Sequence, residues 1–572
     1  MNNLNKLLLS ITTIFLITGC SANVQYITAS TPGTATIRIY KDNDTASIER
    51  YIPPKNVDIA YTYQSLSGLL ANNASVCPSI GDVNLLVIPV HIPGSEEYRT
   101  IEIKNDIEKM FFSEKSNRLG FKSVKEYFYE SSYGKLNFDG IVTDWFDVAE
   151  YTNIKSASEI TQGSDGTIMT KILPNAIEFA KTKQGINLKD FDKDEDGNID
   201  AVWLVYDHLD WTIEFEQKLK ENPNYNGSDI NSSFWNFTAW DYNTPAGKKG
   251  ELPTQSAFSW ASFDMMYTGY ATRDEDGYMD LSNLNDIKLD SHTFIHETGH
   301  LLGLEDYYAA DDSKYHPMGK NTMMDQNICD LDSYSKLLLG WVTPYVVYGT
   351  SEILIESATK NDHSVIVIPT NYEEISNEIE IAHKYNKIND YRYSFNPFSE
   401  YILIDLYTPE RLNWSDTYGT PINDRDYGIM GDGVRIYHID SRIFECKAYS
   451  FEDGVYLSYV DGYVWDGGKL GSDETILMPI SNQKLESTSY QLPTNFDFFD
   501  QCRLIESSGF NTFDNGGCAD ENTLWTTESQ PFDIAKFAYQ FFNANYSFND
   551  GTELPFKIKV LTLTMSDDVV NI

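Results

Sequence analysis

His296 and His300 lie four residues apart in a segment whose apolar residues recur at helical spacing. Side chains four residues apart leave the same face of a helix, so the two imidazoles can chelate one zinc ion. Glu297 is rotated by about a quarter of a turn from His296. A carboxylate at that position can take a proton from a water molecule that zinc activates. These three residues predict metal-assisted hydrolysis with Glu297 as the general base.

A catalytic zinc site also needs a third protein ligand and one open coordination position. Gly303 can adopt the left-handed conformation that ends a helix and reverses the chain, and Asp306 follows three residues later. A glutamate on a distant helix is disfavoured as the third ligand, because none occurs between Glu305 and Glu352 and the latter stands in a strand-like run. His316 fits no zinc spacing. The sequence therefore predicts Asp306 as the third zinc ligand.

The motif His-Glu-x-x-His-x-x-Gly-Leu-x-Asp over residues 296–306 resembles that of the immune inhibitor A-type metallopeptidases, which are metzincin-like. Further stretches that are similar to this family are 123–128, 132–136, 334–341, 503–506 and 511–513. The resemblance covers roughly residues 80–565. It implies a zincin fold and hydrolysis of peptide bonds in extracellular proteins.

The resemblance also implies a methionine turn beneath the metal, for which Met324 is the better candidate and Met323 the second. Glu305 departs from the family, in which a proline is common at that position. A tyrosine could stabilise the negative charge that develops on the scissile carbonyl oxygen. The sequence does not choose among Tyr307, Tyr308 and Tyr334.

An acidic loop covers residues 192–200. Its carboxylates fall at positions 1, 3, 5 and 9 of an EF-hand-like loop, and Gly197 stands at the sixth position, where such loops turn sharply. The pattern is partial, because Trp203 occupies the twelfth position and a strand follows. A solvated acidic turn is the alternative, and the family resemblance favours calcium. The predicted calcium ligands are Asp192, Asp194, Asp196, Asp200 and the backbone carbonyl of Asn198.

Strand and helix patterns alternate between residues 80 and 345. The expected strands are 85–90, 136–146 and 201–206, and the expected helices are 101–113, 123–131 and 168–183. This alternation predicts one α+β unit over residues 81–345, and the resemblance implies that this unit is the zincin (metzincin-like) catalytic domain. Short β-branched runs follow, at 352–355, 365–368, 401–404, 434–437 and 558–564. They predict a mostly β, sandwich-like C-terminal region over residues 346–572.

An apolar run over residues 7–17 is too short to span a bilayer as a permanent helix and is typical of a signal peptide. It ends in Ile-Thr-Gly-Cys, which resembles the bacterial lipoprotein signal. We expect a signal peptide at residues 1–19 and a lipid anchor on Cys20 that holds the protein at the extracellular face of the bacterial membrane. A cleaved signal and a secreted protein are the alternative. Residues 20–80 are expected to be a lead-in or pro-segment.

Five cysteines remain besides Cys20, and an odd number cannot be fully paired within one chain. Only Cys502 and Cys518 are close enough in sequence to favour a local, loop-closing disulfide.

The chain carries 85 acidic and 43 basic residues and a net charge of -42. Such a field repels nucleic acid, so we exclude partners of that class. The expected partners are protein or peptide substrates and, through the lipid anchor, the membrane. The predicted function is that of a zinc metalloendopeptidase. A catalytically idle surface binding protein or adhesin on the same fold is the alternative, and the intact Glu297 argues against it, because a binding protein needs no general base.

Overall fold

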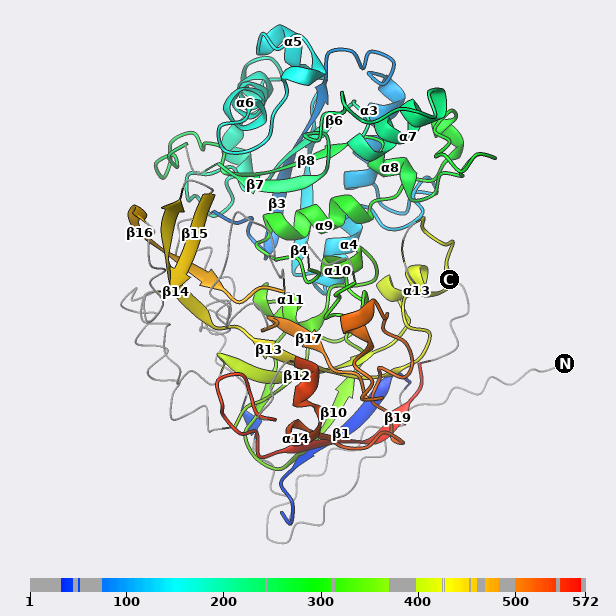
Figure 1. Ribbon diagram of the computed structural model, residues 1–572, viewed down its shortest axis with the longest axis vertical. Helices are drawn as coiled ribbons and strands as arrows, with labels where there is room; N and C mark the ends of the chain where they lie inside the picture. Colours follow the sequence, from blue (N-terminus) through cyan, green and yellow to red (C-terminus); the bar gives the residue numbers. More distant parts are fainter. Residues whose placement is uncertain are drawn as a thin grey trace, which may run out of the picture.

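The computed structural model describes residues 32–44, 50–51, 75–241, 244–309, 314–369, 398–423, 425, 427–451, 454–459, 469–482, 499–541 and 546–566. The predicted signal peptide and Cys20 lie outside these residues. Figure 1 shows one sheet with its helices in the upper part of the molecule, two sheets in the lower part, and a further sheet of residues 443–479 at mid-height on the left. Among the described helices, none is long and apolar enough to cross a membrane.

The upper sheet is parallel except at one edge. Its order is β4 (Leu136–Val142), β3 (Gly81–His91), β6 (Val202–Tyr206), β8 (Ala257–Ser262) and β7 (Phe237–Trp240), and β5 (Phe146–Asp147) also pairs with β3. Only β7 is antiparallel to its neighbour. Strands of a parallel sheet are buried on both faces, which accounts for the continuous apolar run within β3, where every residue from Leu85 to His91 is buried.

Helices cover both faces of the upper sheet (Figure 1). α3 (Ile101–Phe112), α4 (Val124–Ser131) and α9 (His292–Leu301) pack on one face, and α6 (Leu173–Thr182) follows a π-helical turn, η2 (Ile168–Ile172), on the other. Alternate residues of β3 accordingly enter two different apolar clusters. The other helices described in this part of the chain are α5 (Val148–Tyr151), η1 (Ala157–Glu159), η3 (Leu188–Phe191), α7 (Trp211–Glu221), α8 (Met265–Thr268), η4 (Leu284–Asp286), α10 (Met323–Gln326) and α11 (Ser333–Leu338).

The other strands that the structure describes form three sheets, two of them in the lower part of the molecule. The first has the order β17 (Cys502–Leu504), β13 (Gly433–Asp440), β12 (Glu400–Tyr407), β11 (Val365–Val367), β9 (Tyr345–Val347) and β2 (Arg50–Tyr51). The second has the order β10 (Ser351–Glu356), β1 (Thr34–Tyr40), β19 (Lys557–Thr564) and β18 (Phe532–Asp533), and the third has the order β15 (Gly454–Tyr459), β14 (Ile443–Phe451) and β16 (Lys469–Pro479). Short helices accompany them: α13 (Leu412–Tyr418), η6 (Thr512–Asn515), α14 (Ile534–Phe537) and η7 (Ala538–Phe541).

β1 is an interior strand of the second lower sheet. It pairs antiparallel with β10 on one side and with β19 on the other. Ala35, Ile37 and Ile39 are each 0% exposed and lie in the apolar cluster that the first two lower sheets share. Residues 34–40 of the predicted lead-in or pro-segment are therefore part of the sheet that β10 and β19 form, and the interpretation of residues 20–80 stays a prediction.

One apolar cluster crosses the expected domain boundary at residue 345. It joins residues of the upper unit, such as Phe294 and Met324, to residues of the C-terminal half, such as Tyr401, Tyr437 and Phe513. A contiguous core of this kind makes the C-terminal half a structural support of the upper unit.

Most expected elements are confirmed within one to four residues at their ends. The fold is mixed α and β, and the sandwich-like arrangement of the C-terminal sheets stays a prediction. The predicted disulfide between Cys502 and Cys518 is wrong, because Cys502 is a buried thiol in β17. Its side chain belongs to the core, so the short loop to Cys518 does not bring the two sulfur atoms together.

We predict that Ile37→Ala lowers the free energy of unfolding by about 2–5 kcal/mol, since it removes a fully buried side chain from an interior strand. Leu354→Ala is the matched control on neighbouring β10, because Leu354 is 43% exposed, and it should cost about 0.5 kcal/mol. Chemical denaturation measures both values. Equal midpoints for the two variants would show that β1 is dispensable.

Candidate active site and metal centre

Helix α9 presents the predicted metal ligands and then reverses the chain. Gly303 has a φ of +93°, a conformation that glycine adopts without steric cost and that commonly ends helices. Its N–H donates to the carbonyl of His300, and the N–H of Leu304 donates to the carbonyl of Gly299. The chain therefore folds back along the helix, and this reversal brings Asp306 beside the two histidines.

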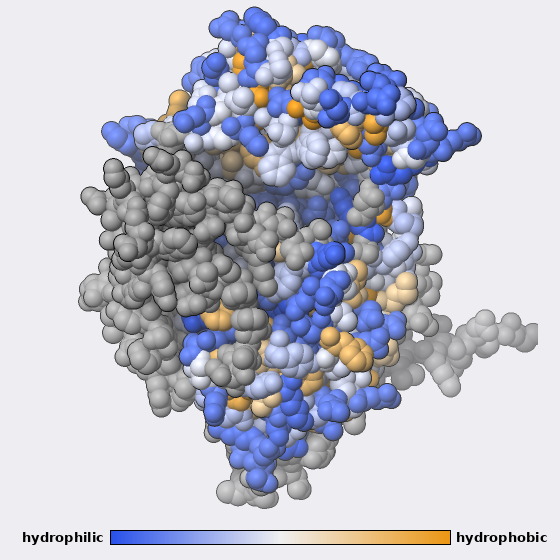
Figure 2. Space-filling view, in the orientation of Figure 1, coloured by the Kyte–Doolittle hydropathy of each residue, from blue (hydrophilic) through white to orange (hydrophobic). Residues whose placement is uncertain are grey.

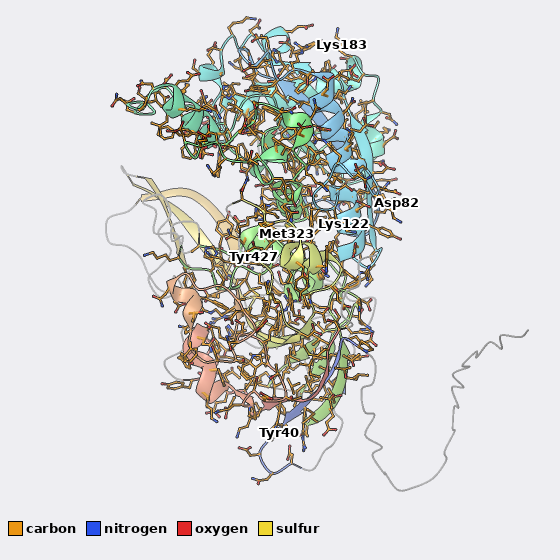
Figure 3. All side chains as sticks on the ribbon, turned by 90° about the vertical axis from the view of Figure 1, so that its right-hand side faces the viewer. Tyr40, Asp82, Lys122, Lys183, Met323 and Tyr427 are labelled. Atoms are coloured by element: carbon orange, nitrogen blue, oxygen red, sulfur yellow. The ribbon has the colours of Figure 1, made fainter. Side chains whose placement is uncertain are left out.

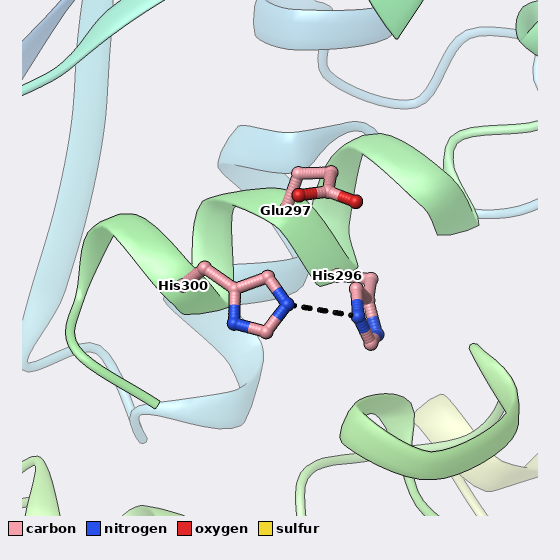
Figure 4. Close-up of side chains that lie close together, drawn as sticks. All are labelled: His296, Glu297 and His300. Carbon is pink, nitrogen blue, oxygen red and sulfur yellow. Dashed lines mark hydrogen bonds between the residues drawn. The ribbon is translucent and has the colours of Figure 1, made fainter. Parts of the chain in front are cut away.

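The three predicted ligands converge on one point. His296 Nε2 lies 2.9 Å and His300 Nε2 lies 3.2 Å from Asp306 Oδ1, and the two nitrogens are 3.1 Å apart. Figure 4 shows both imidazoles on the same side of α9, joined by the contact between their nitrogens. Ligands at zinc distances in tetrahedral geometry lie about 3.3 Å apart. The spacing of these three atoms therefore fits a zinc ion.

The protonation of the two imidazoles also fits a metal. His296 Nδ1 lies 2.8 Å from the carbonyl oxygen of Met323, and His300 Nδ1 lies 2.8 Å from that of Leu304. A carbonyl oxygen only accepts, so each Nδ1 carries a hydrogen and a neutral ring has its lone pair on Nε2. Two lone pairs and a carboxylate oxygen at these distances repel one another unless a positive charge lies between them.

The local electrostatics favour such a positive charge. Burial alone lowers the pKa of His300, but the Asp306 carboxylate outweighs burial and raises that pKa to about 10. Burial alone raises the pKa of Asp306, yet His300 and His296 hold it well below its usual range. The three groups thus bind either a proton or a metal ion.

One carboxylate oxygen of Glu297 lies within 4.8 Å of a ring nitrogen of each histidine, and Figure 4 shows the three side chains close together on α9. Its Oε1 accepts a hydrogen bond of 2.8 Å from Asn236 Nδ2, and its Oε2 accepts one of 2.8 Å from Thr238 Oγ1. Glu297 is 4% exposed. The edge strand β7 and the residue before it therefore fix the orientation of this carboxylate, and sequence analysis did not find either partner.

The methionine-turn candidates lie directly beneath α9. The Met323 carbonyl holds His296, as described above, and the Met324 sulfur packs against the backbone of Gly299 so closely that a Cβ there would lie 2.6 Å from it. The Met324 carbonyl accepts from the N–H of Tyr307. Both residues are 0% exposed. Met324 is thus the residue whose side chain supports the helix between the two histidines.

Residues 95–327 match the family model of the immune inhibitor A peptidase M6, catalytic domain. The chain carries an immune inhibitor A-type peptidase domain. The match includes α9, Asp306 and the methionine turn, and it ends at the residue after α10. The resembling stretches at 334–341, 503–506 and 511–513 lie outside it. No curated protein matches the chain.

A buried ionic network holds the start of α9 in the peptidase domain. His292 Nδ1 lies 2.5 Å from Asp290 Oδ1, and its Nε2 lies 3.2 Å from Asp416 Oδ1 of α13. Burial lowers the pKa of His292, but Asp416 and Asp290 together raise it. Arg425 Nη1 lies 3.1 Å from Asp290 Oδ2. Two partners in this network come from the C-terminal half, outside the matched peptidase domain, and the sequence held no signal for them.

A cavity of about 620 Å³ opens between the peptidase domain and the C-terminal half. Figure 2 shows a hollow with hydrophilic walls between the upper and lower parts, and Figure 3 shows Met323 and Tyr427 at the level where those parts meet. The lining of the cavity includes Tyr308, Asp325 and Arg425. His316 also lines it, and its Nδ1 lies 2.6 Å from Asp325 Oδ1.

The predicted calcium loop is only partly assembled. Carboxylate oxygens of Asp192, Asp194 and Asp200 lie within 4.8 Å of one another. Burial and neighbouring carboxylates raise the pKa values of all three, that of Asp200 to about 7. Asp196 instead accepts hydrogen bonds from the backbone and side chain of Asn198. The structure therefore brings together three of the five predicted ligands.

We predict that Gly299→Ala destabilises the protein by about 1–3 kcal/mol, because the new methyl group overpacks against the Met324 sulfur. The sign of the change in the free energy of unfolding tests the packing, since Gly→Ala in a helix with space around the glycine stabilises by about 0.5–1 kcal/mol. Met324→Ala should relieve the clash, so the double variant should be more stable than the sum of the single effects. A stabilised Gly299→Ala protein in urea denaturation would contradict the described packing.

Proposed function

We propose that the chain is a zinc-dependent metalloendopeptidase that hydrolyses peptide bonds of extracellular proteins. The observation that carries the proposal is the convergence of His296 Nε2, His300 Nε2 and Asp306 Oδ1 within 3.2 Å of one another. The peptidase domain supports it.

In the proposed mechanism, His296, His300 and Asp306 hold the zinc, which when bound activates water and polarises the scissile carbonyl. Glu297 takes the proton from the attacking water and passes it to the leaving amine. The hydrogen bonds from Asn236 and Thr238 keep its carboxylate in one orientation while leaving each oxygen a further lone pair for that proton.

A catalytically idle surface binding protein is the second candidate. Such a protein has no use for a buried glutamate beside the metal ligands, because an ionised carboxylate is costly to bury. Two hydrogen bonds that orient Glu297 support catalysis over this alternative.

The lipid anchor and the extracellular location remain part of the proposal. They are supported by the apolar run at residues 7–17 and by Cys20. Mass spectrometry of the mature N-terminus tests them: an unmodified terminus beyond Cys20 would exclude the anchor.

The decisive experiment compares zinc content and proteolysis in three variants. Glu297→Gln should retain stoichiometric zinc and lose nearly all hydrolysis of a generic protein substrate, because the ligands stay and the base is lost. Asp306→Ala should lose zinc to a mild chelator, whereas Glu305→Ala should retain it. Near-wild-type hydrolysis by Glu297→Gln would exclude the mechanism, and zinc loss from the Glu305 variant would move the ligand assignment by one residue.

We further propose that the loop at residues 192–200 binds calcium, supported by the three converging carboxylates. Calcium should raise the melting temperature, and Asp194→Ala should abolish that rise. Glu195→Gln is the control in the same loop, since the Glu195 side chain is 67% exposed.

The calcium effect should depend on pH. Asp200, with a pKa raised to about 7, is protonated in acid and must lose that proton to bind calcium. The rise in melting temperature should therefore be larger at about pH 8 than at about pH 5.5. Identical melting curves with calcium and with a calcium chelator, on zinc-loaded protein, would refute the calcium site.

A further inference from the structure

A second cavity, of about 480 Å³, lies where the peptidase domain meets the C-terminal half. Figure 3 labels Lys122, one of its lining residues, at the height where the upper and lower parts of the molecule join. The charged residues of the lining are the basic Lys115, Lys122, Lys360 and Arg411 and the acidic Glu126 and Glu130. In the whole chain, acidic residues outnumber basic ones by 85 to 43. The cavity therefore reverses the charge balance of the protein.

Both acidic residues of this cavity are held by donors of the protein itself. Glu130 Oε1 accepts a hydrogen bond of 3.0 Å from Arg411 Nε, and its Oε2 lies 3.0 Å from Lys122 Nζ. Glu126 Oε1 accepts a hydrogen bond of 2.8 Å from the backbone N–H of Lys115, and its Oε2 closes the capping box at the start of α4. Each of the four carboxylate oxygens thus already has a donor.

The basic residues, in contrast, keep donors that the protein does not use. Among the residues that the structure describes, neither the Lys115 ammonium nor the two Nη nitrogens of Arg411 have a hydrogen-bond or ion-pair partner. Tyr129, which is 54% exposed, adds a phenol to the lining. Ammonium and guanidinium groups only donate hydrogen bonds. The cavity therefore fits a ligand that brings negative charge and several acceptor oxygens.

The backbone is unusual at three of the lining residues. Lys115, Tyr133 and Arg411 have φ values of +55°, +58° and +53°, in the left-handed region that residues with a side chain seldom adopt. Arg411 directly precedes α13, and its ψ of −119° completes the angles of the first central residue of a type II′ turn, where glycine is usual. Strained backbone of this kind gathers at ligand-binding sites. Here the strained residue supplies a guanidinium to the cavity.

We propose that this cavity binds a phosphate group, which joins α4 of the peptidase domain to the start of α13 in the C-terminal half. The planar guanidinium of Arg411 can bind two phosphate oxygens side by side, and the Lys115 ammonium can bind a third as a point charge. A carboxylate has only two oxygens and cannot engage donors from both parts of the protein as fully. Free phosphate and the head group of an anionic phospholipid share this chemistry. None of the predicted metal ligands belongs to the described lining, so the site is independent of the proposed peptidase mechanism.

Titration calorimetry of the full-length protein with inorganic phosphate, at constant ionic strength and with chloride as the reference anion, tests the site. Wild type should bind phosphate, and Lys115→Met should lower the affinity by about ten-fold. The Lys115 ammonium has no partner to lose, so the melting temperature without phosphate should stay within about 1 °C of wild type. Lys183→Met is the matched control, because it removes the same charge from an exposed lysine near the top of the molecule (Figure 3). This control should bind phosphate as wild type does.

Arg411→Gly separates the guanidinium from the backbone conformation that presents it. Glycine adopts the angles of this position without strain, so the start of α13 should keep its geometry. We expect this variant to bind phosphate at least about ten-fold more weakly than wild type.

Glycerophosphoglycerol, the deacylated head group of an anionic phospholipid, distinguishes the two sources of phosphate. Tighter binding of this soluble phosphodiester than of inorganic phosphate assigns the site to a lipid head group, and the reverse order assigns it to the free anion. The inference is overturned if wild type binds neither probe. It is also overturned if wild type, Lys115→Met and Arg411→Gly bind the preferred probe equally well.

Discussion

Three converging side-chain atoms set the main constraint on this protein. His296 Nε2, His300 Nε2 and Asp306 Oδ1 lie within 3.2 Å of one another, an arrangement that is stable only when a proton or a cation lies between them. Two of the ligands leave one rigid helix, and the third arrives only because Gly303 reverses the chain. A residue with a side chain at Gly303 would be strained, and a changed reversal would no longer bring Asp306 beside His296 and His300.

Helix α9, which bears His296 and His300, is held in place by contacts at its start, its middle and its end. Its start is tied by the charges around His292, one of which, Asp416, belongs to the C-terminal half. Its end is tied by the N–H of Cys77, which donates to the Leu301 carbonyl. Met324 packs beneath its middle. Because these restraints come from segments distant in sequence, the geometry of the site depends on the whole fold and not only on the matched peptidase domain.

Sequence reasoning reached the residues whose roles follow from local periodicity. The spacing of His296 and His300 and the break at Gly303 are properties of one helix and its end, so eleven consecutive positions, 296–306, were sufficient to place Asp306. Asn236 and Thr238 could not be found in this way, because only the position of β7 beside α9 brings them to Glu297. The partners of β1 could not be found from the sequence either, since alternation of side chains says nothing about which distant strands complete a sheet. The EF-hand-like pattern assigned calcium ligands only by their position in the loop, whereas the Asn198 side chain donates a hydrogen bond to the Asp196 carboxylate.

The placement of β1 has a consequence for the order of folding. Thr34 pairs with Thr564, so a strand synthesised near the beginning of translation acquires its second neighbour only when β19 has been made. Contacts of such large sequence separation form slowly. A chain that stops before β19 carries the complete zinc motif but leaves one edge of β1 open, with its amide and carbonyl groups free to pair with another chain. Truncation before β19 therefore exposes an edge at which chains can pair with one another and aggregate.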